Sequence, residues 1–129
     1  MRIYFPVSCR ILTIGHIKCL AWLYSKSTDI VIGVITDEGM KGYKDPIVPF
    51  KDRFEIVETI ATGMRVVTQS SLDPTENVKN YRCDAIASGD GWEKCELEAI
   101  KKFKLKKINI PLPKKYSSSK IIQDIKIHV

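Results

Sequence analysis

The run Ile30-Val31-Ile32-Gly33-Val34-Ile35 is the feature that most constrains the fold of this chain. It is almost entirely β-branched and shows no alternation of polar and apolar residues, so it predicts a strand that is covered on both faces, as in a parallel sheet. A shorter apolar run at residues 2–7 predicts a second buried strand, and residues 17–24 between the two runs carry apolar side chains at helical spacing. The chain therefore begins as strand, helix, strand.

The same alternation continues along the chain. Residues 39–49 contain two glycines and two prolines and predict a loop, and Pro49 then precedes an amphipathic helix that ends at Gly63. The further predicted elements are a strand at 65–68, a short helix at 72–81, a strand at 84–88, a helix at 92–103, a strand at 107–110 and a helix at 119–127. This order predicts an α/β fold, a Rossmann-like, doubly wound, mostly parallel five-stranded sheet with helices on both faces.

Length and cysteine usage indicate how such a fold is stabilised. With 129 residues, 1–129 is expected to form a single domain whose core needs neither a metal nor a disulfide. The four cysteines form no C-x-x-C pair and lie in apolar segments, so we expect reduced, mostly buried thiols. No stretch approaches the ~20 apolar residues of a membrane span, and the first residues lack the pattern of a signal peptide. We therefore expect a cytoplasmic protein with no membrane partner.

The charge is distributed unevenly. The net charge is +6, but from Lys101 onward nine lysines face one acid, a charge of +8, so residues 1–100 carry −2. A basic last quarter suits a nucleic acid, a small polyanion such as a nucleotide, or simply a solvated surface. No aromatic residues alternate with these lysines to form a stacking platform, so nucleic-acid binding is the least favoured of the three.

Four unusual segments follow predicted strands. In doubly wound sheets ligands bind at the rim, that is, at the carboxyl ends of the strands and the loops that follow them, where the strand order reverses. Residues 8–16, 36–37, 89–92 and 114–119 all belong to this predicted rim. The Gly15-His16 pair stands where a strand passes into a helix, and a helix N-terminus with a nearby imidazole suits a phosphate group. The alternative is a tight turn with a histidine bonded to backbone.

The other segments also have two readings. Asp37 could hold a metal or a substrate hydroxyl, or it could cap a helix. Residues 89–92 could let backbone approach a ribose or base, or they could form a turn beside a core aromatic. The serines at 117–119 could cap a helix and also bind phosphate. Lys41 and Lys44 could close over a triphosphate, or they could be ordinary solvated lysines.

Over essentially all 129 residues the chain resembles the small cytidylyltransferase-type nucleotidyltransferases, most closely the glycerol-3-phosphate cytidylyltransferase group. The resemblance rests, in chain order, on Gly15-His16-Ile17-Lys18, Ile35-Thr36-Asp37-Glu38, Arg53 with Glu58-Thr59-Ile60, Gly89-Asp90-Gly91-Trp92-Glu93 and Ser117-Ser118-Ser119-Lys120-Ile121. It implies that a phosphorylated or phosphonate acceptor attacks the α-phosphorus of CTP and that pyrophosphate leaves. It also implies Mg²⁺ as cofactor and a homodimer.

The resemblance assigns roles to individual residues. His16 and Lys44 would be catalytic, with Thr13 at the place of the first histidine of the family motif H-x-G-H. The nucleotide and its phosphates would be bound by Ser8, Gly15, Lys41, Arg53, Gly89, Asp90, Trp92, Ser117 and Ser118. The acceptor would be bound by Arg10, Asp37 and Lys114.

Two departures from the family pattern keep other functions open. Thr13 can donate a hydrogen bond but has no charge, and Arg10 stands where the family has an acidic residue. An impaired, nucleotide-binding regulatory or scaffold protein of the same fold is therefore one alternative. An adenylyltransferase that uses ATP is another, because the same phosphate-binding groups would serve it.

Overall fold

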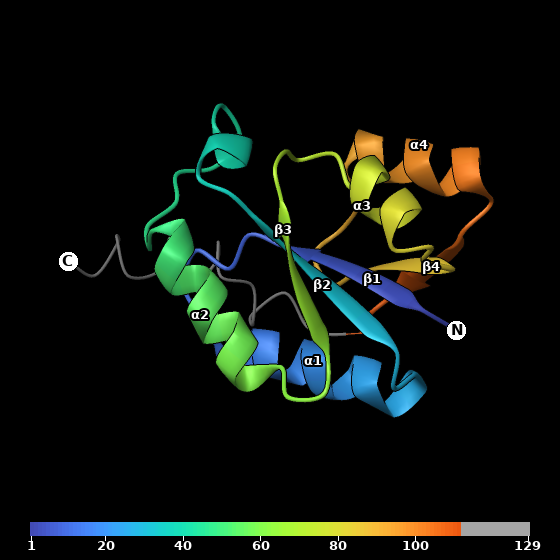
Figure 1. The fold of residues 1–129 in the computed structure, drawn as a ribbon, viewed down its shortest axis with the longest axis horizontal. Helices are drawn as coiled ribbons and strands as arrows, with labels where there is room; N and C mark the ends of the chain where they lie inside the picture. Colours follow the sequence, from blue (N-terminus) through green and yellow to red (C-terminus); the bar gives the residue numbers. More distant parts are fainter. Residues whose placement is uncertain (112–129) are drawn as a thin grey trace.

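The structure is a computed structural model that describes residues 1–111, and it confirms the predicted α/β fold (Figure 1). The elements are, in chain order, β1 (Ile3–Val7), α1 (Ile14–Lys26), β2 (Ile30–Ile35), the 3-10 helix η1 (Glu38–Met40), α2 (Phe50–Ile60), β3 (Arg65–Gln69), α3 (Thr75–Asn80), β4 (Ala85–Ser88), α4 (Lys94–Phe103) and β5 (Lys106–Asn109). The predicted helix at 119–127 and the candidate residues Lys114, Ser117 and Ser118 lie outside the described residues.

The sheet is parallel throughout and reverses its order at β1. Its strand order is β3-β2-β1-β4-β5, and each neighbouring pair runs in the same direction. The chain first builds outward from β1 through β2 to β3, and it then returns to place β4 on the other side of β1. The carboxyl end of β1 is therefore the crevice at which a doubly wound sheet usually binds its ligand.

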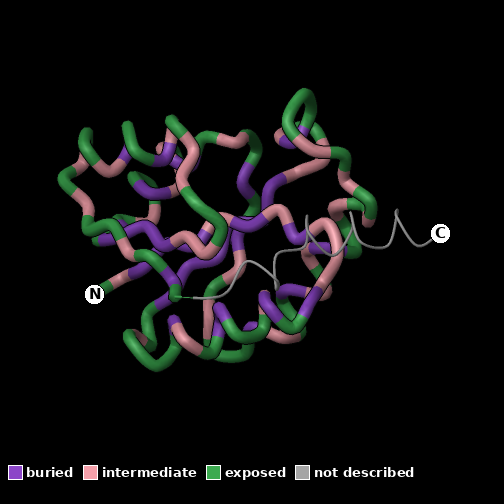
Figure 2. The backbone as a smooth tube through the Cα atoms, turned by 180° about the vertical axis from the view of Figure 1, so that it is seen from behind, coloured by how far each residue is buried: buried purple, intermediate pink, exposed green. Residues whose placement is uncertain are grey.

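Helices cover both faces of the sheet. Side chains of α1 and α2, such as Leu23 and Val57, pack into one apolar cluster with β1 and β2. Val78 of α3 and Ala99 of α4 belong to a second cluster on the opposite face. Every residue of β2 is buried between the two layers, as the uninterrupted apolar run predicts. Figure 2 shows the buried backbone concentrated in these central strands.

The Tyr4 side chain of β1 contacts both β2 and β3 on the α3 side of the sheet. Its side chain passes over Gly33 of β2 so closely that a Cβ at position 33 would lie 1.8 Å from the tyrosine oxygen. The Tyr4 hydroxyl donates to Oε1 of Gln69 on β3 at 2.5 Å, and the amide of Asn77 on α3 donates to the same hydroxyl at 3.0 Å. Gly33 is therefore required by the approach of Tyr4, and a strand interior is otherwise a poor place for glycine.

The predicted loop at 39–49 begins with one helical turn that the sequence did not reveal. The backbone N–H of Gly39 donates to the hydroxyl of Thr36 at 2.9 Å, and the 3-10 turn buries Met40, which is 1% exposed. Two glycines and two prolines obscured this turn, because those residues normally signal irregular backbone.

Within residues 1–111, none of the helices has the length and apolarity that a membrane crossing requires. Cys9, Cys19, Cys83 and Cys95 are all free thiols. Burial raises the pKa of the Cys9, Cys19 and Cys83 thiols to about 11, so these cysteines are poor nucleophiles at neutral pH.

Candidate functional site

The N-terminus of α1 holds His16 in a defined protonation state. Thr13 is the N-cap residue, and its backbone N–H donates to Nδ1 of His16 at 3.1 Å. The Thr13 hydroxyl lies 3.1 Å from the same ring nitrogen. Because a backbone N–H can only donate, Nδ1 must be unprotonated, and in the neutral imidazole the proton is then on Nε2. His16 is therefore a hydrogen-bond donor through Nε2.

The charges around His16 come from two other loops of the rim. Burial lowers the pKa of His16 below its ordinary value of 6.5, the Asp90 carboxylate opposes this shift, and the Lys44 ammonium adds to it. His16 is therefore neutral at pH 7. His16 follows β1, Lys44 follows β2 and Asp90 follows β4, so the structure brings Lys44 and Asp90 into electrostatic range of His16.

The end of β4 lies close to α1. A Cβ at Gly89 would be 3.1 Å from Sγ of Cys19 on α1, so a larger residue would push the two elements apart. The hydroxyl of Ser88 then bonds to the carbonyl of Gly91, whose φ of +114° favours glycine. This tight turn leaves Asp90 exposed at the rim.

Arg53 lies beneath the rim and is 0% exposed. Its guanidinium donates to the carbonyls of Ser8 (2.6 Å), Ile35 (2.8 Å) and Val48 (2.8 Å). Ser8 directly follows β1, Ile35 is the last residue of β2, and Val48 lies near the end of the β2–α2 loop. It also donates to Oδ1 of Asp37 at 2.7 Å. Arg53 thus ties three chain segments together, and no part of its guanidinium is exposed to a phosphate in this structure.

Asp37 accepts hydrogen bonds from two groups of the protein. Besides Arg53, the backbone N–H of Phe50 at the start of α2 donates to its Oδ2 at 3.3 Å. The Arg53 hydrogen bond lowers the pKa of Asp37, and the Phe50 N–H lowers it further, while desolvation opposes both. Its side chain is still 44% exposed, so a carboxylate edge remains open at the rim beside its structural role.

The segment 41–49 of the β2–α2 loop crosses the rim and is held by other loops. Arg10, which follows β1, donates from Nε to the carbonyl of Asp45 at 2.7 Å. The Tyr43 hydroxyl donates to Oε1 of Glu93, the N-cap residue of α4, at 2.8 Å. Burial and the Glu93 carboxylate raise the pKa of Tyr43, so the hydroxyl keeps its proton at neutral pH.

The two lysines of this segment have different surroundings. Nζ of Lys44 lies 5.0 Å from the centre of the Tyr43 ring, and Lys44 is partly buried. Lys41 forms a 3.5 Å ion pair with Glu38 in which both side chains are about 80% exposed, an arrangement that contributes little. Sequence reasoning did not single out Tyr43 or Glu93 as site residues. The only signals were the place of Tyr43 between two lysines and the place of Glu93 directly after Trp92.

Trp92 is anchored by the protein itself. Its indole N–H donates to Oδ1 of Asn109 at 2.7 Å, and Nζ of Lys107 lies 5.2 Å from the ring centre. The ring packs against the apolar cluster on the α3–α4 face. Within residues 1–111, the contacts of Trp92 are therefore those of an aromatic side chain that the protein itself holds in place.

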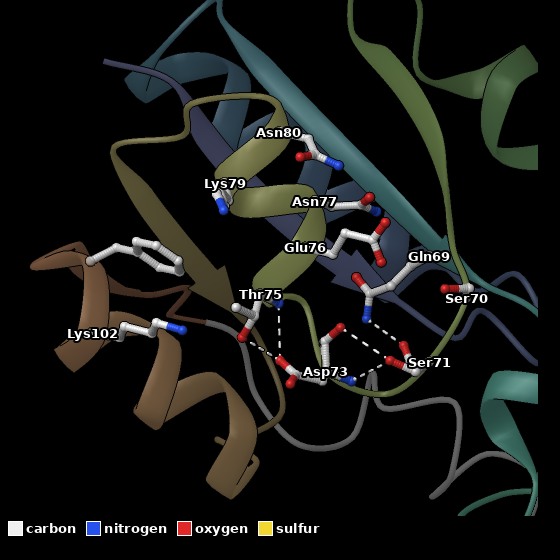
Figure 3. A pocket seen from close by; sticks show the side chains of 11 residues that line it. Gln69, Ser70, Ser71, Asp73, Thr75, Glu76, Asn77, Lys79, Asn80 and Lys102 are labelled. Atoms are coloured by element: carbon white, nitrogen blue, oxygen red, sulfur yellow. Dashed lines mark hydrogen bonds between the residues drawn. The ribbon is translucent and has the colours of Figure 1, made fainter.

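A separate pocket of about 470 Å³ lies at the end of β3, between the loop that follows it, α3 and α4 (Figure 3). Its lining mixes carboxylates such as Glu76 with lysines such as Lys102. The Gln69 amide donates to the carbonyls of Ser71 and Leu72, and Asp73 accepts from Thr75, so these polar groups stabilise the loop. None of the sequence-predicted site residues within 1–111 lines this pocket.

Comparison with known proteins gives a family and a fold. The model of a family described as cytidylyltransferase-like matches residues 10–124. A lipopolysaccharide core biosynthesis protein from Thermoplasma volcanium has a similar structure, with a TM-score of 0.72 and 21% identity, over 88% of this chain and 98% of that one. A protein of unknown function from Archaeoglobus fulgidus is similar over 85% of this chain and 89% of its own, with a TM-score of 0.69 and 18% identity. No curated protein matches the chain. At these identities the structural likeness shows the fold alone.

Proposed function

Because the chain belongs to the cytidylyltransferase-like family, we propose that it transfers the CMP group of CTP to a small phosphorylated or phosphonate alcohol or amine. An oxygen of the acceptor's phosphate or phosphonate would form the new bond to the α-phosphorus. The bond between that phosphorus and the oxygen bridging to the β-phosphate would break, and pyrophosphate would leave with that oxygen. The family supports nucleotidyl transfer in general, and the choice of CTP and of the acceptor is our proposal.

One observation carries the proposal: in the first turn of α1 the Thr13 backbone N–H bonds to Nδ1 of His16, which leaves Nε2–H as the donor, and the Lys44 ammonium is near enough to lower the pKa of this imidazole. The first backbone N–H groups of a helix have no carbonyl partner within it, and the helix dipole favours an anion there. Nε2–H of His16 would donate to a phosphate oxygen, while Lys44 would balance the charge that develops around the transferred phosphorus. Phosphoryl and nucleotidyl transfer need this positioning more than they need covalent catalysis.

Mg²⁺ would fit the rim as a partner of the nucleotide. Mg²⁺ is usually held by one or two carboxylates together with substrate phosphates, and Asp90 supplies an exposed carboxylate beside His16. Residues 1–111 contain no group of three or more acidic, histidine or cysteine side chains that could hold a metal without the substrate. When bound, the ion would neutralise phosphate charge. We also propose that the protein acts as a homodimer, which rests on the resemblance alone, and that it works in the cytoplasm, which rests on the sequence pattern alone.

The proposal is tested by ³¹P NMR of the protein with Mg²⁺, CTP and a pool of phosphomonoesters and phosphonates, with ATP in a parallel sample. We expect pyrophosphate and a new mixed-anhydride signal with CTP. The same signals with ATP alone would make the protein an adenylyltransferase. Nucleotide binding without pyrophosphate in either sample would support the impaired, nucleotide-binding alternative, which Thr13 favours because it replaces an imidazole.

Two alanine variants connect the activity to the site. Lys44→Ala is expected to lower turnover by roughly a hundredfold, the loss typical of removing one electrostatic contact from a transition state. Lys51→Ala removes an exposed lysine from α2 and serves as the matched control. Equal activity of the two variants would remove Lys44 from the mechanism. His16→Ala should lower turnover far more than it lowers the melting temperature.

A further inference from the structure

We propose that Tyr43 and Glu93 form a latch that closes the β2–α2 loop over the rim, and that Tyr43 thereby positions Lys44 beside His16. In this role Tyr43 is a positioning residue that acts through Lys44. The second half of the inference rests on the proposed function. The first half, the latch itself, does not.

The sheet topology shows which part of the fold the Tyr43–Glu93 hydrogen bond crosses. Tyr43 follows β2 and Glu93 follows β4, and these strands are not neighbours because β1 lies between them. The 2.8 Å bond from the Tyr43 hydroxyl to Glu93 therefore spans the carboxyl end of β1, where the chain enters α1. This is the position at which the strand order reverses, so the bond bridges the crevice in which a ligand is expected.

Both sequence neighbours of Lys44 form hydrogen bonds to other loops. Its neighbour Tyr43 is bonded to Glu93, and its other neighbour Asp45 accepts a 2.7 Å hydrogen bond from Arg10. The Lys44 ammonium lies 5.0 Å from the Tyr43 ring centre, within the range of a cation–π contact. Contacts from three loops of the rim thus hold the Lys44 ammonium close enough to His16 to lower the pKa of its imidazole.

Core packing does not explain the position of Tyr43. Its side chain is 38% exposed, and it belongs to neither apolar cluster of the described residues. Gly42 before it has a φ of +76°, and a Cβ there would meet no atom within 4 Å. The Tyr43 hydroxyl therefore carries much of the attachment between the tip of this loop and α4, and breaking its bond to Glu93 would detach the tip from α4 without disturbing the core, while the Arg10–Asp45 bond would remain.

Limited proteolysis tests the latch without any ligand. Trypsin can cut after Lys41 and Lys44, on either side of Tyr43. Tyr43→Phe keeps the ring for Lys44 and removes only the hydroxyl, so we expect cleavage in this loop to be about fivefold faster, the order of one partly exposed hydrogen bond to a carboxylate. Tyr24→Phe is the matched control, because it removes the hydroxyl of an exposed tyrosine on α1, far along the chain from this loop. Equal cleavage of Tyr43→Phe and wild type would overturn the latch.

A double-mutant cycle tests whether Glu93 is the partner. Glu93→Gln replaces the charged acceptor of the Tyr43 hydroxyl by a neutral amide oxygen, which weakens the hydrogen bond, and it keeps a polar side chain at the N-cap of α4. We expect Glu93→Gln to increase cleavage in the wild-type background and to have no further effect in Tyr43→Phe. Fully additive effects would show that the two side chains are not coupled and would overturn the latch.

The activity of the same variants tests the positioning role. Tyr43→Phe should lower the rate of pyrophosphate release several-fold in the wild-type background and should change nothing when Lys44→Ala is already present. A further loss in the Lys44→Ala background would show that Tyr43 does not act through Lys44. If the wild type releases no pyrophosphate from CTP or ATP, the proposed function and the positioning role both fail, whereas the cleavage results still decide on the latch.

Discussion

Replacing Arg53 by methionine should strongly destabilise the protein while leaving its surface unchanged. Arg53 is fully buried and makes four hydrogen bonds of 2.6–2.8 Å, three to carbonyls and one to the Asp37 carboxylate. The Asp37 side chain is 44% exposed and can be solvated when Arg53 is lost, so losing the ion pair itself costs only about 1 kcal/mol. Each carbonyl left without a partner adds about 1–3 kcal/mol where water does not enter. We therefore expect a loss of at least about 4 kcal/mol in the free energy of unfolding.

Urea unfolding at pH 7, followed by circular dichroism, measures this loss. For a domain of this length, 4 kcal/mol corresponds to a decrease of roughly 12–20 °C in melting temperature. Arg65→Met is the control, because Arg65 is exposed on β3 and its loss should cost no more than about 0.5 kcal/mol. A loss below about 1.5 kcal/mol for Arg53→Met would refute the reasoning. If Arg53 instead contacts phosphate, the variant would keep its stability and lose nucleotide affinity.

Three further predictions concern other parts of the structure. Folding lowers the pKa of His16, so as the pH falls below 6.5 the unfolded chain binds a proton at this residue before the folded protein does. The free energy of unfolding, measured by urea titrations, should therefore decrease as the pH falls through this range. His16→Gln should remove the part of the decrease that is due to this residue. Gly33→Ala should cost about 1–3 kcal/mol or more by urea unfolding, since its Cβ would overlap Tyr4, and a neutral result would contradict the packing. Thr13→His should speed pyrophosphate release if the missing imidazole limits the rate, and an unchanged or lower rate would contradict this.

Within residues 1–111, local patterns were enough to predict the strands and the α-helices of the fold, though not the 3-10 turn η1. The six-residue run of β2 predicts a doubly covered strand, and Pro49 predicts the start of α2, because each signal depends only on nearby residues. The alternation of strands and helices predicted a doubly wound sheet and placed the segments of His16 and Asp90 on one rim, whereas the strand order and the place of Lys44 come from the structure.

Side-chain partners distant in sequence could not be predicted in this way. Tyr43 and Glu93 are 50 residues apart, and nothing in either segment indicates the other. The resemblance implied that Arg53 binds the nucleotide and its phosphates, whereas in the structure its guanidinium donates to carbonyls from three separate segments. Such carbonyls are present at every residue, so only the three-dimensional path of the chain shows which of them meet.

The closeness of Tyr4 to Gly33 has a consequence for how this sequence can diverge. A side chain at position 33 requires the tyrosine ring to leave its place, and a smaller residue at position 4 removes the need for glycine at 33. Losing the tyrosine also leaves the Gln69 carbonyl oxygen without its donor. Relatives that share this arrangement should therefore change positions 4, 33 and 69 together, and a set of homologous sequences would show these three positions co-varying although they lie on three different strands.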